Sequence, residues 1–343
     1  FREEVVRRIF SQLLQAVAFL HQNRFLHLDI KLENVLINIR GDVKLIDFGC
    51  SKQMEQGAVP SRSILTTDSY ASNESPNPSE RKKPEIDTKS LTSWNALLIK
   101  ALIKSYLAFQ NENYLEEAKE ISNWIIDYQL KKNGALCHNF VNGSASIDGF
   151  LNDYSFTIDA FILLYQVSGE IKWLEYSKNL IEKVDTDFNS VKHDLYYFSN
   201  SKSELISRKI EIEDDVIPSS NSVLANCFFQ LGIYFRRDDW VLQSKKMLSC
   251  VIDKMELYPM SYSNWFHLYS KFVFPCSEIS FLQEKEGLNH QDLKSLIKPM
   301  HVISYHTSIP MSKEFKEGIF VCKSNTCLPK IGSIEELLSV VNE

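Results

Sequence analysis

Apolar residues recur at intervals of three and four along residues 3–21, which is the spacing of a helix with one buried face. Two short runs rich in Val, Ile and Leu follow at 34–39 and 42–46, with Arg40 and Gly41 between them. This pattern predicts a β-hairpin that carries polar groups at its ends. The chain is therefore expected to begin with one packed helix and a small sheet.

From residue 91 onward the chain repeats a unit of two predicted helices, the first apolar on nearly every side and the second amphipathic. Only a helix that is covered all round can be apolar all round, so the first helices should form an inner layer and the second helices an outer one. The first helices are predicted at 95–110, 153–167 and 221–235, the second helices at 116–130, 175–184 and 243–255, and the connecting turns at 113–115, 172–174 and 239–241.

The repeat favours a mainly α fold, an incomplete (α/α) toroid, preceded by a small α+β segment. Residues 262–274 would begin a fourth pair, after which the pattern changes to mixed strand and helix. A strand is expected at 319–322 and a capped terminal helix at 333–341. Residues 72–87 contain three prolines and hardly an apolar side chain, which is typical of a linker between two parts.

Composition places the chain among ordinary globular proteins, with 343 residues, 44% hydrophobic residues, 24% charged residues and a net charge of -6. The acidic balance argues against a nucleic-acid partner, and the lack of a long apolar run argues against a membrane partner. The seven cysteines are odd in number and scattered, so a reducing, cytoplasmic setting is expected. Cys322 and Cys327 could form a redox pair or half a metal site, but ordinary buried thiols are the favoured interpretation.

Two motifs near the start of the chain carry candidate chemistry. Residues 27–34 read His-Leu-Asp-Ile-Lys-Leu-Glu-Asn, and residues 47–49 read Asp-Phe-Gly after the predicted hairpin. Phosphoryl transfer needs carboxylate and amide oxygens to hold magnesium, a cation beside the transferred phosphate and an acceptor for the hydroxyl proton. In order and content the two motifs resemble the catalytic loop and the magnesium-binding motif of serine/threonine protein kinases.

The kinase resemblance implies a role for each matching residue. Asp29 would be the catalytic base and Lys31 the phosphate contact, while Asn34 and Asp47 would bind Mg²⁺, with ATP as the second cofactor. Leu28 stands where most kinases have Arg, which puts control through a phosphorylated activation loop in doubt.

Other kinase parts are faint or expected elsewhere. Residues 66–74 faintly resemble the end of an activation segment. The Gly-rich loop, the strand Lys and its Glu partner would lie before residue 1, so the segment is expected to be truncated and inactive.

Polar and aromatic residues gather just before the predicted inner helices. If these helices run parallel, their preceding loops meet at one end of the ring and form a cleft with two carboxylates and several aromatic faces. Helix N-termini favour anions or hydroxyl-rich ligands there. The clusters are residues 92–95, 150–154, 213–215, 218–222 and 262–265.

Four stretches are similar, in order, to the C-terminal half of the YyaL and spermatogenesis-associated protein 20 family, also called the DUF255 family. In that family a thioredoxin-like domain precedes a six-hairpin, glycosidase-like α/α barrel. The resemblance implies that barrel for residues 85–343, with Asp153 and Asp214 at matching acidic positions and Thr88 replacing one further acid. The stretches are residues 87–98, 149–162, 213–222 and 320–328.

Asp153 and Asp214 are the candidate catalytic pair of the barrel. One carboxyl group would act as an acid and the other as a base or stabiliser on a carbohydrate or other small molecule. The alternative is that both are helix caps that satisfy backbone donors. No cofactor is implied for the barrel, and its candidate ligand-binding residues are Trp94, Asn95, Tyr154, Asn221 and Trp265.

We therefore expect four segments: a kinase-like fragment at 1–74, a linker at 75–88, barrel hairpins at 89–275 and a mixed C-terminal segment at 276–343. The favoured function is a six-hairpin glycosidase-like protein that binds or acts on carbohydrate, joined to an inactive kinase segment. The alternative is an ATP·Mg phosphotransfer protein with a helical scaffold. The sequence leaves enzymatic activity and oligomeric state open.

Overall fold

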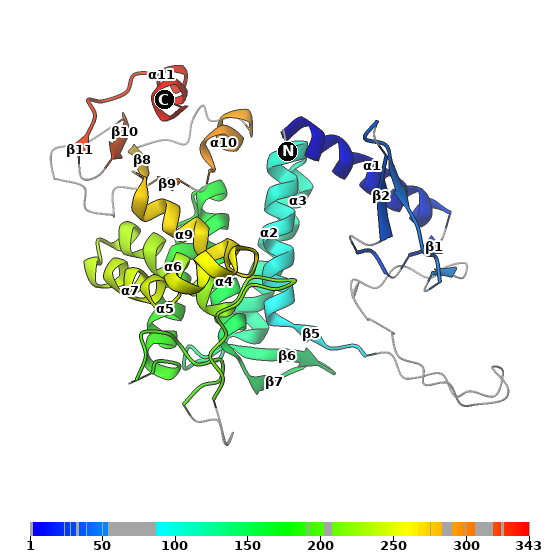
Figure 1. Cartoon of the computed structure of the whole chain (residues 1–343), viewed down its shortest axis with the longest axis horizontal. Coiled ribbons are helices and arrows are strands. Elements are labelled where there is room, and N and C mark those ends of the chain that lie inside the picture. The colour runs from blue at the N-terminus through cyan, green and yellow to red at the C-terminus, as the bar shows by residue number, and fades with distance from the viewer. Residues whose placement is uncertain are drawn as a thin grey trace. The chain divides into compact units, whose positions relative to one another are not determined.

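A computed structural model divides the chain into two compact units, Phe1–Thr88 and Lys89–Glu343 (Figure 1), and each unit is described by itself. The finer division into four segments stays a prediction, because the proposed linker lies almost wholly outside the described residues. So do Leu28 and residues 66–74. The described residues are 3–23, 25–27, 29–31, 34–38, 40–49, 51–53, 87–190, 192–201, 208–274, 276–282, 290–298, 300–305, 318–323 and 326–342.

The first unit contains the predicted helix and hairpin. Helix α1 spans Glu3–Gln22, and strands β2 (Val35–Ile37) and β3 (Val43–Leu45) form an antiparallel pair. A second pair joins β1 (Phe25–Leu26) to β4 (Lys52–Gln53). The predicted helix and hairpin are confirmed, and the β1–β4 pair was not foreseen.

Polar contacts tie the helix of this unit to its hairpin. The Gln12 side chain donates to the Gly41 carbonyl oxygen over 2.8 Å and accepts from the Val43 amide over 3.1 Å. Among the residues of the unit whose exposure is described, only His27 and Asn34 are buried, whereas Phe19 is 64% exposed. Apolar burial therefore stabilises the described part of this unit only weakly.

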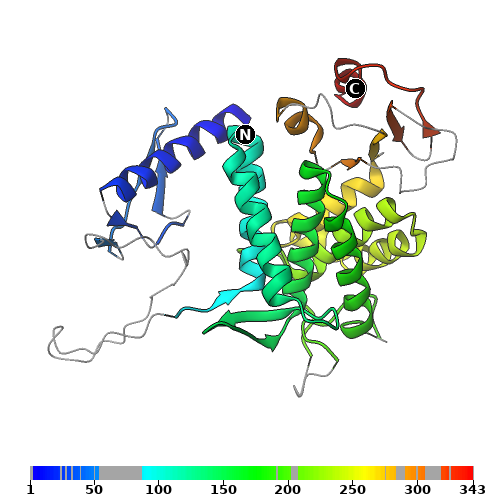
Figure 2. The same ribbon diagram turned by 180° about the vertical axis from the view of Figure 1, so that it is seen from behind.

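The second unit is built from pairs of helices (Figures 1 and 2). Each of three inner helices packs against the outer helix that follows it, and the inner helices α2, α4 and α6 lie side by side in that order. The pairs are α2 (Thr92–Phe109) with α3 (Glu112–Trp124), α4 (Leu151–Ser168) with α5 (Lys172–Asp187), and α6 (Ser220–Phe235) with α7 (Asp238–Ser249).

The mainly α, paired-helix architecture predicted from the repeat is confirmed, with two corrections. Tyr114, Trp173 and Trp240, which the sequence placed in turns, lie in the first turns of the outer helices. Helices α4 and α6 are buried along nearly their whole length, but α2 leaves Trp94 and Leu98 close to half exposed. Helix α2 is therefore covered on fewer sides than its apolar composition predicts.

The remaining helices follow the inner and outer pairs. Helix α8 spans Ile252–Leu257, a short 3₁₀ turn follows at Pro259–Tyr262, and α9 spans Ser263–Val273. Helix α9 is the predicted fourth inner helix and packs against α6. Helix α10 (His290–Leu296) and the predicted terminal helix α11 (Ile334–Asn342) complete the set.

Two sheets flank the helices of this unit. The first has the order β5–β6–β7 and was not foreseen. Its strands are Ser90–Leu91, Cys137–Val141 and Ser144–Asp148. The second has the order β11–β10–β8–β9, with β8 and β9 parallel. It includes the predicted strand as β10, and its strands in chain order are Ser277–Leu282, His301–Ser304, Gly318–Lys323 and Thr326–Cys327.

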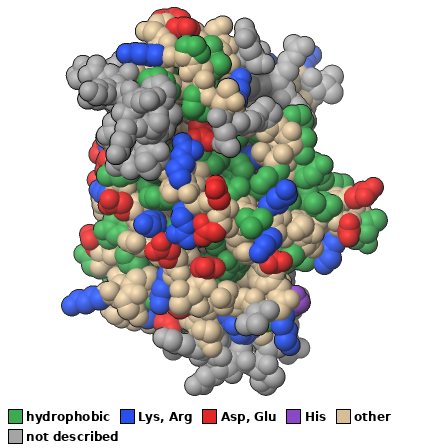
Figure 3. All heavy atoms as spheres, turned by 90° about the vertical axis from the view of Figure 1, so that its left-hand side faces the viewer, with side chains coloured by type: hydrophobic (Ala, Val, Ile, Leu, Met, Phe, Trp, Pro, Cys, Tyr) green, Lys and Arg blue, Asp and Glu red, His purple; other side chains and the backbone are tan. Residues whose placement is uncertain are grey.

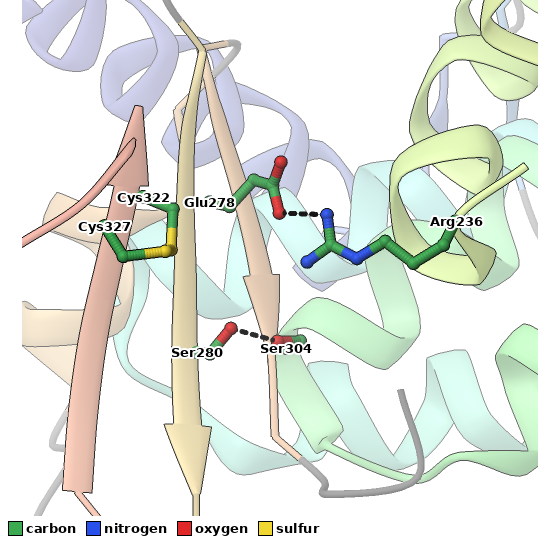
Figure 4. Close-up of a disulfide and its surroundings, with 6 residues drawn as sticks. All are labelled: Arg236, Glu278, Ser280, Ser304, Cys322 and Cys327. Carbon is green, nitrogen blue, oxygen red and sulfur yellow. Dashed lines mark hydrogen bonds and ion pairs between the residues drawn. A yellow bond between two sulfur atoms is a disulfide. The ribbon is translucent and has the colours of Figure 1, made fainter. Parts of the chain in front are cut away.

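A disulfide joins Cys322 on β10 to Cys327 on β11, where the two residues lie opposite each other in the antiparallel register (Figure 4). The expectation of two ordinary thiols is therefore wrong. Figure 4 also shows an ion pair at 2.7 Å between Arg236, which ends α6, and Glu278 on β8. This pair connects the second sheet to an inner helix.

Lys and Arg are interspersed with Asp and Glu over the coloured part of the face drawn in Figure 3. Because positive and negative side chains are mixed, the electrostatic potential over this face is not of a single sign. Within the part of the chain that the structure describes, no helix combines the length and apolar character that crossing a membrane requires.

Gly232 allows the inner helix α6 to approach the outer helix α7 closely. A Cβ atom at this position would lie 2.6 Å from Val241 Cγ2 and 3.0 Å from the Val241 amide nitrogen. We expect Gly232→Ala to lower the free energy of unfolding by about 1–3 kcal/mol, because the overpacking outweighs the better helix propensity of alanine. Urea denaturation would measure the loss. The double variant with Val241→Ala should regain part of it, and a single variant as stable as the original chain would contradict this packing.

Candidate functional site

The kinase-like loop brings three of its four predicted residues into direct contact. The Asn34 side-chain amide donates to the Asp29 carbonyl oxygen over 2.8 Å and to the Asp29 carboxylate over 3.0 Å. Lys31 Nζ lies 2.9 Å from the same carboxylate. The hydrogen bond from Lys31 lowers the pKa of Asp29, although partial desolvation opposes it. A lowered pKa keeps this carboxylate ionised near neutral pH and also makes it a weaker proton acceptor.

Asp47 is held next to this loop by the residue before it. The Ile46 amide donates to the Asn34 carbonyl oxygen over 2.9 Å, and the Ile46 carbonyl oxygen lies 3.0 Å from His27 Nε2. Asp47 has a positive φ of 61°, and its carboxylate accepts from the Gly49 amide over 3.2 Å. Carboxylate and amide oxygens are the donor set that suits Mg²⁺, so the chemistry of Asn34 and Asp47 fits the implied ion.

Asp153 fastens two inner helices together. It is fully buried, and its carboxylate accepts from the Phe150 amide over 2.9 Å, at the start of its own helix, and from the Ser93 amide over 3.0 Å, at the start of α2. His138 Nδ1 lies 2.8 Å from the same carboxylate. These contacts match the helix-cap interpretation, because free amides at helix starts need acceptors and their positive dipole end favours an anion.

Asp214 does the same for the next two inner helices. It is 8% exposed, and its carboxylate accepts from the Ser219 amide over 2.9 Å and from the Ser222 hydroxyl over 2.8 Å at the start of α6. The other oxygen accepts from the Asn264 amide over 2.8 Å in the first turn of α9. Among the described contacts none joins Asp214 to Asp153, so each carboxylate serves its own pair of helices.

The five candidate ligand residues of the barrel differ in exposure. Tyr154, Asn221 and Trp265 are buried, and each makes a hydrogen bond to backbone: Tyr154 accepts from the Leu136 amide, Asn221 donates to Tyr196 and Glu211, and Trp265 donates to Ile212. Asn95 is half-buried and donates to Ser90 Oγ and to the Leu91 carbonyl oxygen. Trp94 is 45% exposed. A ligand role for these five residues stays a prediction.

A cavity of about 260 Å³ lies among the inner helices, and we call it the inner cavity. Its polar lining was not predicted from the sequence. The lining residues are Lys100 and Lys104 on α2, Asp159, Ile162, Leu163 and Gln166 on α4, Val223, Asn226 and Gln230 on α6, Asn264, His267 and Lys271 on α9, and then Ile297, Lys298 and His301.

Burial and neighbouring charges shift the pKa values of groups that line the inner cavity. Burial alone would lower the pKa of Lys100, but the adjacent Asp159 carboxylate, with which it forms an ion pair, raises it above its usual value. Burial and then the charge of Lys100 lower the pKa of Lys104. Burial also lowers the pKa of Lys271 and of His267, so this imidazole stays neutral at neutral pH. Perturbed groups that converge in a cavity are typical of a functional site.

A sequence signal for this cavity was present and went unused. Each inner helix is otherwise apolar, yet its polar residues fall three, four or seven positions apart, as Lys100 and Lys104 or Asn264, His267 and Lys271 do. Such spacing puts them on one face of a helix. Polar residues on one face of a helix that is covered on all sides indicate a shared polar cavity.

The geometry defines two classes of structure in one chain: a kinase-type catalytic loop followed by helical hairpins around a polar cavity. Residues 1–153 match the family model of the protein kinase domain. This match passes the boundary between the units and includes α2 and α3, which the structure packs with the helical hairpins. The chain is also 35% identical over 121 residues to human NUAK family SNF1-like kinase 2, covering 35% of this chain and 18% of that kinase.

Most of the chain is similar to a second group of proteins. It is 25% identical over 290 residues to the uncharacterized protein B0495.5 of Caenorhabditis elegans, covering 77% of this chain and 39% of that protein. It is 24% identical over 267 residues to human spermatogenesis-associated protein 20, covering 75% of this chain and 34% of that protein. Both resemblances inferred from the motifs are thereby confirmed. The chain spans little more than a third of the length of these two relatives.

Solved structures give a weaker likeness. Cellobiose 2-epimerase from Bacillus thermoamylovorans is 17% identical with a TM-score of 0.40, covering 48% of this chain and 44% of that chain. Unsaturated glucuronyl hydrolase from Bacillus sp. GL1 is 14% identical with a TM-score of 0.40, covering 50% and 49%. These TM-scores are too low to support an assignment, so the architecture is defined by the helix pairs themselves.

The pair of His138 and Asp153 makes a prediction about pH. The hydrogen bond that His138 donates to the Asp153 carboxylate raises the pKa of His138, despite its partial burial, above the ordinary value of 6.5. Charged His138 therefore stabilises the fold fully below that ordinary value, and the stabilisation is lost as the pH rises through the raised pKa. We expect His138→Gln to lower the free energy of unfolding by roughly 1–2 kcal/mol near pH 5.5, with a smaller loss near pH 8.5.

Urea denaturation of both proteins at the two pH values would measure this difference. His193→Gln, at an exposed position, serves as the matched control and should leave the pH dependence unchanged. If the loss of unfolding free energy caused by His138→Gln grows as the pH rises, the predicted direction of the pH dependence is wrong.

Proposed function

We propose that residues 89–343 bind a carbohydrate in the inner cavity. The observation that supports this function is the set of amide side chains that line it, those of Gln166, Gln230, Asn226 and Asn264. An amide group both donates and accepts hydrogen bonds, which matches a ligand that presents many hydroxyl groups. The proposal agrees with the resemblance to the barrel family, whose sugar link rests on fold alone.

The size of the inner cavity favours a small ligand. Its volume of about 260 Å³ lies below the roughly 300–1,000 Å³ typical of sites for drug-sized molecules. A monosaccharide is the class of carbohydrate that suits this space. Ile162, Leu163 and Val223 supply apolar surface beside the amides, as sites for small ligands usually do.

Asp214 contributes to this site through its neighbour. Its carboxylate accepts a hydrogen bond from the backbone amide of Asn264. Asn264 lines the cavity, and its side chain donates to Ser222 Oγ over 2.9 Å. We therefore assign Asp214 a positioning role. Asp159 is the carboxylate that lines the cavity itself, so it is better placed than Asp153 or Asp214 to touch a ligand.

Gln230→Leu tests the carbohydrate proposal. The substitution keeps the size of the side chain and removes its hydrogen-bonding groups from the cavity lining. We expect it to weaken monosaccharide binding to the full chain about tenfold, since a lost polar contact to a ligand costs roughly 1–1.5 kcal/mol. Isothermal titration calorimetry with a panel of aldoses would measure the affinities.

Gln243→Leu is the matched control, because Gln243 lies on the outer helix α7 and is absent from the cavity lining. Equal losses from the two variants, or no binding of any aldose by the original chain, would contradict a carbohydrate site in the inner cavity.

The combined variant Asp153→Asn with Asp214→Asn tests the acid and base roles. Unchanged turnover of a bound sugar would remove those roles.

A second candidate function belongs to the first unit. The contacts among Asp29, Lys31 and Asn34 favour a magnesium and nucleotide site for phosphotransfer to a Ser or Thr hydroxyl. Bound Mg²⁺ would neutralise charge on the phosphates. Asn34 and Asp47 would hold the ion, Lys31 would contact the phosphate, and ionised Asp29 would accept the hydroxyl proton.

Asp47→Asn tests this second candidate. We expect the full chain to bind ATP with Mg²⁺ and the variant to bind it at least tenfold more weakly, because a charged ligand of the ion is removed. Fluorescence of a nucleotide analogue would follow the titration. Asp42→Asn, in the turn of the nearby hairpin, is the matched acidic control. No binding by the original chain, or equal binding by both variants, would remove the phosphotransfer function.

A further inference from the structure

We infer that the inner cavity contains an anion subsite, so that its ligand is a small sugar bearing a phosphate or carboxylate group. The inference names the ligand class for the proposed carbohydrate site and in that respect rests on it. Lys100 and Lys104 enter the cavity from α2, one turn apart, and Lys271 enters from α9. Three cations from two helices thus surround one space of about 260 Å³.

The described lining of the cavity supplies less negative charge than positive charge. Asp159 is the only carboxylate among the described lining residues, and it pairs with Lys100. Lys271 donates over 2.9 Å to the side-chain oxygen of Asn226, which is neutral. Within the described residues Lys104 has neither a hydrogen bond nor an ion pair. Lys298 also lines the cavity, but it makes interactions of its own and is therefore not counted among these cations.

An excess of cations in a partly dehydrated space is unfavourable. Partial burial strips water from the ammonium groups of Lys100 and Lys271, although Lys104 is itself exposed, and like charges repel one another more strongly where water is scarce. Desolvation lowers the pKa of Lys104 and of Lys271, and the charge of Lys100 lowers both further, while the Asp159 carboxylate offsets only part of the shift. An anionic ligand group would relieve this repulsion, and the ammonium groups would provide charge-assisted hydrogen bonds to it.

The dimensions of the cavity decide what kind of anion fits. A nucleic acid or an acidic protein segment would need an extended basic surface, whereas these lysines line a cavity in a chain whose net charge is -6. The amides of Gln166, Gln230 and Asn264 lie in the same lining and suit hydroxyl groups. A phosphorylated monosaccharide and a sugar acid share the required chemistry.

Calorimetry on the full chain would show whether the subsite binds a sugar phosphate, a sugar acid or phosphate alone. The ligands are glucose, glucose 6-phosphate, glucuronate and inorganic phosphate. We expect at least one anionic sugar to bind about tenfold or more tightly than glucose, an advantage that shrinks as salt rises. Lys104→Gln and Lys271→Gln should each remove most of it. Lys245→Gln, an exposed lysine on the outer helix α7, should change nothing.

The outcomes distinguish this inference from the proposed function. Glucose that binds as well as both anionic sugars, with no effect of the lysine variants, would overturn the anion subsite and leave the carbohydrate site intact. Inorganic phosphate that binds through Lys104 and Lys271 while no sugar adds affinity would support the subsite and overturn the carbohydrate function. No binding of any of the four ligands would overturn both.

The Asp159→Asn variant provides a second test, in which a purely structural role of the cavity lysines would not change the ligand-induced rise in Tm. The substitution releases Lys100 from its ion pair and raises the positive charge of the cavity. We expect the variant to unfold at a lower temperature than the original chain, since Lys100 loses its partner. We also expect the anionic ligand to raise its Tm more than it raises that of the original chain. An equal or smaller ligand-induced rise would overturn the subsite.

Discussion

The second unit depends on two buried carboxylates, Asp153 and Asp214, which accept hydrogen bonds from the starts of its inner helices. The first amides of a helix have no partner within it, and a covered helix must find acceptors elsewhere. Asp153 accepts from the starts of α2 and α4, and Asp214 from the starts of α6 and α9. Each carboxylate therefore fixes two helices at once. The faces that line the inner cavity are set in register by these four contacts.

This constraint also explains which features the sequence could predict. Three-and-four periodicity depends on local burial, so the helix pairs followed from it, as did the terminal helix capped by Ser333. The β6–β7 hairpin was missed although Asn142 and Gly143, both at positive φ, form the Asn-Gly turn that signals one. Asp153 was recognised as important, but the identity of its partners depends on which helices lie side by side. Sequence spacing does not encode that arrangement.

The kinase-like unit is maintained by a different kind of interaction. Its catalytic-loop geometry comes from hydrogen bonds between residues close in sequence, such as Asn34 to Asp29, together with the bonds of Ile46 to His27 and Asn34. Local contacts of this kind need little apolar burial, which agrees with the exposure of Phe19 and Leu36. A motif can thus keep its geometry although no apolar side chain whose exposure is described is buried in this unit, so motif geometry alone is a weak argument for activity.

The inner helices make the opposite case. Helices α4 and α6 are covered on nearly all sides, whereas α2 is partly exposed, and the charged residues that these helices direct into a shared cavity need a physical reason. Lys100 has one in its ion pair with Asp159, but Lys104 and Lys271 form no ion pair with a carboxylate of the described lining. Neutral amides or apolar side chains at these two positions would avoid the repulsion among the ammonium groups and the desolvation of the partly buried Lys271. Because stability alone would disfavour these cations, a ligand of opposite charge is the simplest physical reason for their place in the cavity.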